Sequence, residues 1–171
     1  MVTIDTTGES PLASNLGKIA AGIRNVFGMA FQPGTGDLYF ADNAEDALPG
    51  NNFPPQADEL NVLPAAQIGV TIPDYGFPSC YIQYFTGTQI GSGCVRPIAV
   101  FQPLPDTTSG HPSQGPAGLA FAPPNFPPGL NNGVFIGFSG GNSSRNPVVS
   151  EAVVLPTLFP PTVPTQPVSA P

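Results

Sequence analysis

The residues with the clearest chemistry are an arginine and the carboxylates that follow it along the chain. Arg24 precedes an apolar strand expected at residues 27–31, and a turn at residues 32–36 leads to a second strand at residues 37–42. A planar guanidinium can bind a carboxylate through two parallel hydrogen bonds, so Arg24 is a candidate ligand-binding residue at the mouth of this hairpin. The alternative is that Arg24 joins two loops through backbone carbonyls or pairs with Asp42.

A second set of candidate residues is rich in oxygen donors. The acidic run from Asp42 to Asp46 and the later pair Asp58 and Glu59 belong to a loop long enough to wrap an ion. Calcium prefers such hard oxygen ligands. The sequence therefore predicts a metal site with Asp42, Asn43, Asp58 and Glu59 as candidate ligands, and the alternative is an acidic loop that is simply solvated.

The composition favours an all-β fold of short strands and long loops. The chain of 171 residues contains 24 prolines and 20 glycines, which disfavour helix interiors. Hydrophobic residues make up 40% of the chain, which argues against disorder throughout. Most strand candidates are apolar on both faces, which indicates sheets covered on both sides, as in stacked propeller blades. Strands are expected at residues 27–31, 37–42, 59–63, 81–85, 97–102, 117–122, 133–138 and 151–155.

A short internal repeat supports a blade architecture. Gly28-Met29-Ala30-Phe31 recurs as Gly118-Leu119-Ala120-Phe121, an offset of 118 − 28 = 90 residues. Because propeller blades span about 40 to 50 residues, this offset predicts one blade between the two copies, although a generic hairpin pattern is the alternative. We expect a lead-in over residues 1–15, a partial propeller over residues 16–155 and an extended proline-rich tail over residues 156–171.

Charge and hydropathy exclude two classes of partner. Four Lys and Arg residues against eleven Asp and Glu residues give a net charge of −7, so no basic surface is expected that could neutralise a nucleic acid. No segment approaches the about 20 apolar residues of a membrane-spanning helix. The first residues also lack the regions of a signal peptide, so we expect any export signal to have been removed or to lie outside this sequence.

Two cysteines indicate the compartment. Cys80 and Cys94 stand 14 positions apart among glycines and aromatic residues, which favours a disulfide that closes a hairpin in a secreted or periplasmic protein. Two buried free thiols in a cytosolic protein are the alternative. No histidine or second CxxC motif lies near them, so we do not expect a zinc site.

Several motifs, taken in order, resemble the glucose/sorbosone dehydrogenase family. They are the arginine hairpin that begins at Gly22, the DELN motif at residues 58–61 and the YGFP motif at residues 75–78, where Asp74 replaces the family's usual Asn and Phe77 takes the aromatic position. Each motif alone is weak, and their order carries the resemblance.

A later element, HPSQGPAGLAF, begins at His111 and is similar to a family element, with two extra residues between His and Gly. The resemblance covers roughly residues 22–145. Members of the family are six-bladed propellers that use pyrroloquinoline quinone (PQQ) and calcium. Since a closed ring of six blades needs about 270 residues or more, the resemblance implies a partial propeller of about three blades.

The resemblance implies a role for each candidate residue. Arg24, Asn25 and Arg145 would bind PQQ, a flat tricarboxylate; the alternative for Arg145, which we slightly prefer, is a solvated loop cation. Calcium polarises the quinone carbonyl in the family, and backbone oxygens of the loop after the second strand are among its ligands. Asp42 and Asn43 would therefore act through their position in the chain more than through their side chains.

The resemblance leaves the catalytic base unassigned. Sugar oxidation needs a group that accepts the hydroxyl proton, and in the family this base precedes the arginine hairpin. Residues 1–21 contain no histidine. His111, the one histidine of the sequence, belongs to a Pro/Gly loop, where a structural hydrogen-bonding role is commoner than catalysis.

The sequence therefore predicts a fragment or C-terminal part of a PQQ- and calcium-dependent sugar dehydrogenase of the aldose or sorbosone type, inactive alone. A second hypothesis is a non-catalytic extracellular interaction or structural protein built from propeller blades. A third is a calcium-dependent propeller lactonase. In each case open strand edges favour association, so we expect missing blades, other copies or another chain as partners.

Overall fold

A computed structural model describes residues 1–4, 16–45, 54–101, 114–128, 130–131, 133–139 and 152–155, and for residues 2–4, 16 and 152–155 it describes the backbone alone. These residues contain several antiparallel sheets, one short 3-10 turn, η2 (Ala65–Gln67), and no α-helix. The predicted all-β fold class is therefore confirmed.

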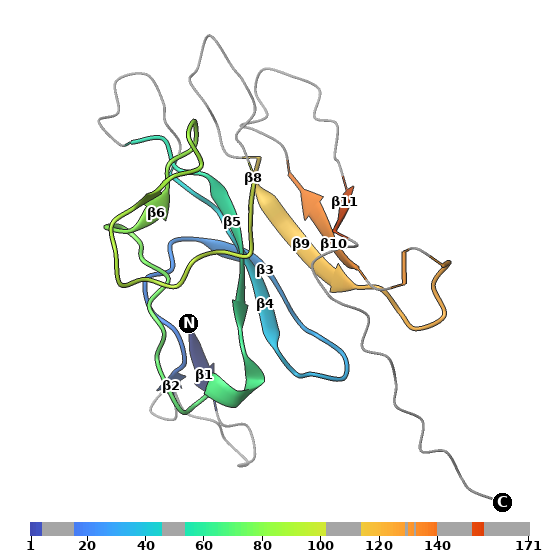
Figure 1. Cartoon of the computed structure of the whole chain (residues 1–171). Coiled ribbons are helices and arrows are strands. Elements are labelled where there is room, and N and C mark those ends of the chain that lie inside the picture. Colours follow the sequence, from blue (N-terminus) through green and yellow to red (C-terminus); the bar gives the residue numbers. More distant parts are fainter. Residues whose placement is uncertain are drawn as a thin grey trace, which may run out of the picture.

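The largest sheet has the topology of a propeller blade. Its four antiparallel strands lie in the order β3-β4-β5-β8. Along the chain, the hairpin formed by β6 and β7 lies between β5 and β8 (Figure 1). An up-and-down sheet of four strands is the repeating unit of a propeller. The strands are β3 (Val26–Phe31), β4 (Leu38–Asp42), β5 (Asp58–Leu63) and β8 (Ala99–Phe101).

A second sheet of three antiparallel strands follows along the chain, in the order β11-β10-β9. Its strands are β9 (Pro116–Phe121), β10 (Val134–Phe138) and β11 (Ala152–Leu155). Two smaller sheets pair β1 (Val2–Ile4) with β2 (Leu16–Lys18), and β6 (Tyr81–Ile82) with β7 (Gln89–Ile90).

Each expected strand has a counterpart among these elements, while β1, β2 and β7 were not predicted. These three strands have only two or three residues, too few to show a period in the sequence. β1 lies within the expected lead-in at residues 1–15, and it pairs with β2, which follows the lead-in. The proline-rich tail at residues 156–171 lies outside the described residues.

The two main sheets pack on each other, and β3 lies closest to β9 (Figure 1). Gly28 permits this approach, because a Cβ atom at this position would lie only 3.0 Å from the carbonyl oxygen of Ala117. One strand farther out, the rings of Tyr39 and Phe121 meet edge to face with centroids 5.1 Å apart. The first strands thus meet backbone to backbone, while aromatic rings fill the wider space beyond them.

This packing corrects the interpretation of the repeat. Gly28 and Gly118 begin the two copies of the motif, and they lie on β3 and β9, the first strands of two sheets in direct contact. The prediction of a blade between the copies is therefore wrong. The 90-residue offset arises from long connections, residues 64–98 before β8 and residues 102–115 after it.

Each face of the larger sheet has its own hydrophobic core, and we name the faces after adjacent residues of β4. Side chains on the Phe40 face pack against the N-terminal segment and the YGFP loop, and the core consists of Ile19, Ala20, Leu38, Phe40, Leu63 and Tyr75. Side chains on the Tyr39 face pack against the second sheet, and that core consists of Tyr39, Leu60, Phe101, Val134, Ile136 and Phe138.

Gly22 allows the arginine segment to lie against the YGFP loop. Ala21 forms a parallel bridge with Asp74, and the backbone N–H of Tyr75 donates to the carbonyl oxygen of Ala21 at 2.9 Å. The φ angle of Gly22 is +63°, and a Cβ atom there would clash with the backbone nitrogen of Gly76. A glycine is therefore required for both conformation and space.

We expect Gly22→Ala to lower the free energy of unfolding by at least about 2 kcal/mol, because the added methyl group meets backbone that cannot rotate away. Urea denaturation followed by circular dichroism measures this loss.

Gly69→Ala is the matched control. Gly69 also has a positive φ, +75°, but in the described part of the chain no atom lies within 4 Å of a Cβ built there. Its substitution should cost only the strain of a left-handed residue, about 1 kcal/mol. Equal losses in the two variants would show that the close approach at Gly22 contributes nothing.

Candidate functional site

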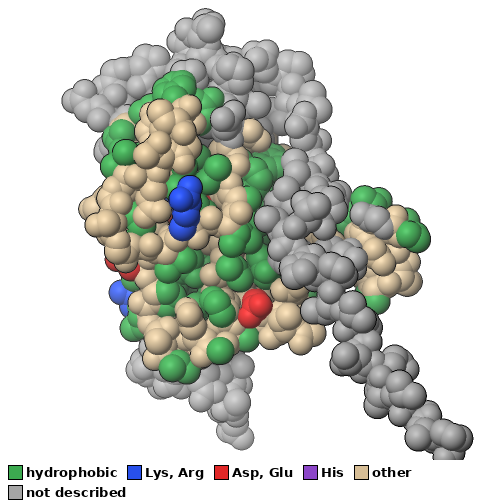
Figure 2. Space-filling view, viewed as in Figure 1, with side chains coloured by type: hydrophobic (Ala, Val, Ile, Leu, Met, Phe, Trp, Pro, Cys, Tyr) green, Lys and Arg blue, Asp and Glu red, His purple; other side chains and the backbone are tan. Residues whose placement is uncertain are grey.

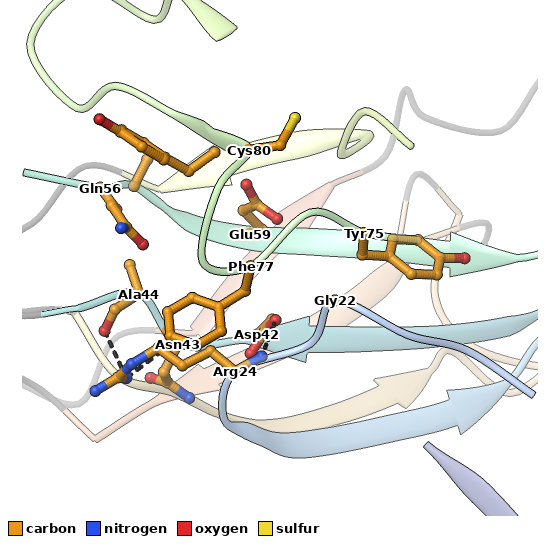
Figure 3. A pocket seen from close by; sticks show the side chains of 12 residues that line it. Gly22, Arg24, Asp42, Asn43, Ala44, Gln56, Glu59, Tyr75, Phe77 and Cys80 are labelled. Atoms are coloured by element: carbon orange, nitrogen blue, oxygen red, sulfur yellow. Dashed lines mark hydrogen bonds between the residues drawn. The ribbon is translucent and has the colours of Figure 1, made fainter. Parts of the chain in front are cut away.

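Arg24 binds the loop that follows β4. Its Nε donates to Oε2 of Glu45 at 2.6 Å, and its Nη1 donates to the carbonyl oxygens of Asn43 at 3.0 Å and Ala44 at 2.7 Å (Figure 3). The side chains of Arg24 and Glu45 are 26% and 22% exposed. This arrangement joins one ion pair to two charge-assisted hydrogen bonds, so the guanidinium holds residues 43–45 in place.

Asp42 fixes the backbone of the same arginine. Its carboxylate accepts hydrogen bonds from the backbone N–H groups of Arg24 at 3.0 Å and Asn25 at 2.6 Å. Burial raises the pKa of Asp42, and these two hydrogen bonds and the charge of Arg24 oppose that rise. The Asn25 side chain itself is exposed, so Asn25 contributes to this network through its backbone.

Asp58 and Asn43 connect the loop to the second sheet. Asp58 is fully buried, and its carboxylate accepts the N–H of Ala44 at 2.9 Å and the N–H of Gln114 at 2.8 Å. The Asn43 side chain donates to the carbonyl oxygen of Pro116 at 3.0 Å. Polar side chains from the first sheet therefore satisfy backbone groups where the second sheet begins, which buried polar groups require.

The carboxyl of Glu59 has a raised pKa. Burial raises the pKa of Glu59 to about 7, and the charges of Asp42 and Asp58 add to the rise. Hydrogen bonds from the Asn61 side chain, at 3.1 Å, and from the backbone of Ile82 oppose it. The carboxyl of Glu59 therefore gains and loses its proton near neutral pH.

The motifs named from the sequence converge on one small cavity. It is lined by the arginine segment, the loop after β4, the DELN motif and the YGFP loop (Figure 3). The space available to the centres of water-sized spheres is about 20 Å³, room for about one water molecule. The lining residues are Gly22, Arg24, Asp42, Asn43, Ala44, Gln56, Ala57, Glu59, Tyr75, Phe77, Cys80 and Tyr81.

The predicted calcium ligands lie together but do not fit a calcium ion in this arrangement. The carboxylates of Asp42 and Asp58 bind backbone N–H groups, and the Arg24 guanidinium binds the carbonyl oxygens of the loop. A cation at these oxygens would meet a positive charge already in contact with them. Within the described parts of the chain, no group of three or more His, Cys, Asp or Glu side chains is arranged to hold a metal.

The residues present do not fit PQQ either. In this arrangement the cavity between the described residues has room for about one water molecule, less than a tricyclic quinone needs, and Arg24 has two of its nitrogens bound to the protein. Arg145 and His111 lie outside the described residues. Of the cofactor-binding residues predicted, the structure therefore places Arg24 and Asn25 at one site, with Arg24 in the alternative role of joining loops.

Sequence reasoning missed the partner of Arg24. The alternative to cofactor binding named Asp42 as the acid, but the ion pair is with Glu45, while Asp42 binds the arginine backbone. A sequence signal was available, because Asp42 ends the strand expected at residues 37–42, whereas Glu45 follows in the loop and can turn back toward the hairpin mouth.

Cys80, which lines the cavity, forms a disulfide with Cys94, as predicted. A loop closed over 14 positions stabilises the folded chain by roughly 3 kcal/mol in the chain-entropy model. A disulfide is typical of proteins from non-reducing compartments. In the part of the chain that the structure describes, no helix is long and apolar enough to cross a membrane.

Comparison with known proteins gives partial matches. The sequence matches no protein-family model. An uncharacterized protein of Borreliella burgdorferi is 47% identical over 45 residues, which cover 26% of this chain and 11% of that protein.

Two solved structures of glucose dehydrogenase are also similar to this chain. One matches with a TM-score of 0.49 and 18% identity over 86% of this chain and 39% of its own length. The other matches with a TM-score of 0.47 and 19% identity over 86% of this chain and 38% of its own length. The chain thus spans less than two fifths of either structure.

The acidity of Glu59 predicts how stability depends on pH. Its pKa rises from 4.5 to about 7 on folding, so between these pH values the folded state binds more protons than the unfolded state. The free energy of unfolding should therefore fall as pH rises from about 4.5 to about 7, by about 1 to 3 kcal/mol from this group. Urea titrations across this range measure the slope.

Glu59→Gln removes the titrating group and keeps the shape of the side chain. We expect the unfolding free energy of the variant to fall less as pH rises. The difference in unfolding free energy between variant and wild type should therefore grow toward pH 8. Parallel stability curves for the two proteins would contradict the assigned acidity of Glu59.

Proposed function

We propose that this chain is a non-catalytic structural or interaction segment built from propeller blades, in which the Arg24 site stabilises the junction between two sheets. One observation carries the proposal: the guanidinium is bound by Glu45 and by the carbonyl oxygens of Asn43 and Ala44. These contacts fill the space at the hairpin mouth, where the resemblance implies a cofactor.

The carboxylates around the site support the same role. Asp42 and Asp58 each accept two backbone N–H groups. A carboxylate that satisfies buried backbone donors is a structural group, and it cannot turn toward a substrate without leaving those donors unpaired. Glu59 has a pKa suited to proton transfer, but the cavity beside it has no room for a sugar.

A sugar dehydrogenase that uses PQQ and calcium is the second candidate. It is favoured by the convergence of the arginine segment, the DELN motif and the YGFP loop on one cavity. In this candidate Glu45 would release Arg24, further blades would supply the rest of the site and the catalytic base, and an aldose or sorbosone would be the substrate. PQQ would supply the oxidant for the sugar when bound.

The lactonase hypothesis is favoured least. It requires carboxylate side chains that point into a central channel to hold calcium, whereas those of Asp42 and Asp58 bind backbone groups. For both remaining candidates we propose a secreted or periplasmic location, supported by the disulfide between Cys80 and Cys94.

A cofactor titration with variants at the ion pair separates the two candidates. We expect wild type and Glu45→Gln, each with calcium present, to show no binding of PQQ up to about 1 mM by calorimetry. We also expect Arg24→Ala to lower the free energy of unfolding by about 1 to 3 kcal/mol, because carbonyl and carboxylate oxygens lose a charged donor.

Arg96→Ala is the control, since it removes an exposed cation that does not line the cavity and should leave stability nearly unchanged. Binding of PQQ to wild type or Glu45→Gln that disappears in Arg24→Ala would reject the structural role and support the dehydrogenase. If Arg24→Ala is as stable as wild type, the structural role of Arg24 is rejected as well.

A further inference from the structure

The first strand of the larger sheet carries a row of exposed apolar side chains. Phe27, Met29 and Phe31 alternate along β3 and are 68%, 52% and 62% exposed. Three large apolar residues on one side of a strand are an unusual surface for a chain that stays alone in water. We call these three residues the β3 row.

The β3 row continues a face of the sheet that is otherwise buried. Met29 lies opposite Phe40 and Phe31 lies opposite Leu38 in the antiparallel register of β3 and β4. Both β4 residues belong to the core on the Phe40 face. That core covers β4 and β5 and reaches Val26 at the start of β3. Met29 and Phe31, farther along the same face of β3, are left in contact with water.

The second sheet shows what covers such a row. By the internal repeat, Met29 and Phe31 correspond to Leu119 and Phe121 on β9. Leu119 and Phe121 pack into the core between the two sheets, and the ring of Phe121 contacts Tyr39 of the preceding sheet. A row of this kind is therefore covered, inside this chain, by the sheet stacked before it.

The opposite side of β9 supplies the matching surface. On β3, the opposite side carries Gly28, which lies against the backbone of β9. The corresponding residue on β9, Gly118, has no atom of the described residues within 4 Å of a Cβ built there, and the next small residue on that side, Ala120, is exposed. The chain thus exposes the β3 row and, along β9, the counterparts of the residues at which its own two sheets meet.

We propose that a second copy of this chain packs on the β3 row through the exposed side of β9. The contact repeats between chains the stacking seen between β3 and β9 within one chain. It joins different surfaces of the two copies, so it is a head-to-tail interface that continues until a ring closes or a filament grows. On the described part of the visible face, charged side chains are few (Figure 2).

The test is association measured by analytical ultracentrifugation over a range of concentrations. Wild type should form dimers and larger species as concentration rises. Phe31→Lys should weaken association at least tenfold by placing a charge in the β3 row, and Gly118→Leu should do so by filling the close contact on β9. Both positions are exposed or have open space around them, so the isolated fold should be kept, which circular dichroism checks.

Mixing the two variants tests the head-to-tail arrangement. Each variant keeps one intact surface, so a mixture should form dimers of one chain of each kind and stop there. Phe85→Lys, at a side chain 59% exposed on the β6–β7 hairpin, is the control and should associate as wild type does.

Three outcomes would overturn the proposal. The first is a wild type that remains monomeric at every concentration. The second is association of the Phe31→Lys and Gly118→Leu variants as strong as that of wild type. Loss of association in both variants without recovery in the mixture would exclude head-to-tail packing. This test does not depend on whether the Arg24 site binds a cofactor, because it measures association at surfaces outside that cavity.

Discussion

The arrangement around the cavity depends on the contacts of the Arg24 guanidinium with the loop after β4. The guanidinium brings a positive charge to the carbonyl oxygens of Asn43 and Ala44 and to the carboxylate of Glu45. Those oxygens belong to a loop just after β4. They carry partial charges of the same sign and would otherwise face one another. Asp58 then binds the N–H of Ala44, so both sides of the loop backbone have partners.

The loop in turn links the two sheets. The Asn43 side chain bonds to the carbonyl oxygen of Pro116, and Asp58 bonds to the N–H of Gln114. Below this polar contact, β3 and β9 meet at Gly28, and the core on the Tyr39 face fills the space between the sheets. Hydrophobic burial gives most of the stacking energy, while the polar contacts set where the second sheet starts.

Much of the fold was predictable because its signals are local. Glycines and prolines mark the turns, and apolar runs such as residues 38–41 mark strands buried on both faces. The spacing of the blades was not predictable, since a 90-residue offset can hold either an extra blade or long connections. The location of the site was predictable from Arg24, Asp42 and Glu59, but the chemical roles of these residues were not. Whether Arg24 meets a ligand or Glu45 depends on the path of a loop, which no local pattern specifies.

Amide hydrogen exchange of Ala44 and Gln114, compared between wild type and Arg24→Ala, tests the central role of the arginine most directly. If the guanidinium holds the loop, both amides should be protected in wild type and lose protection in the variant, while amides of β10 keep theirs. Unchanged protection of Ala44 and Gln114 in the variant would show that the loop and the start of the second sheet hold together without Arg24.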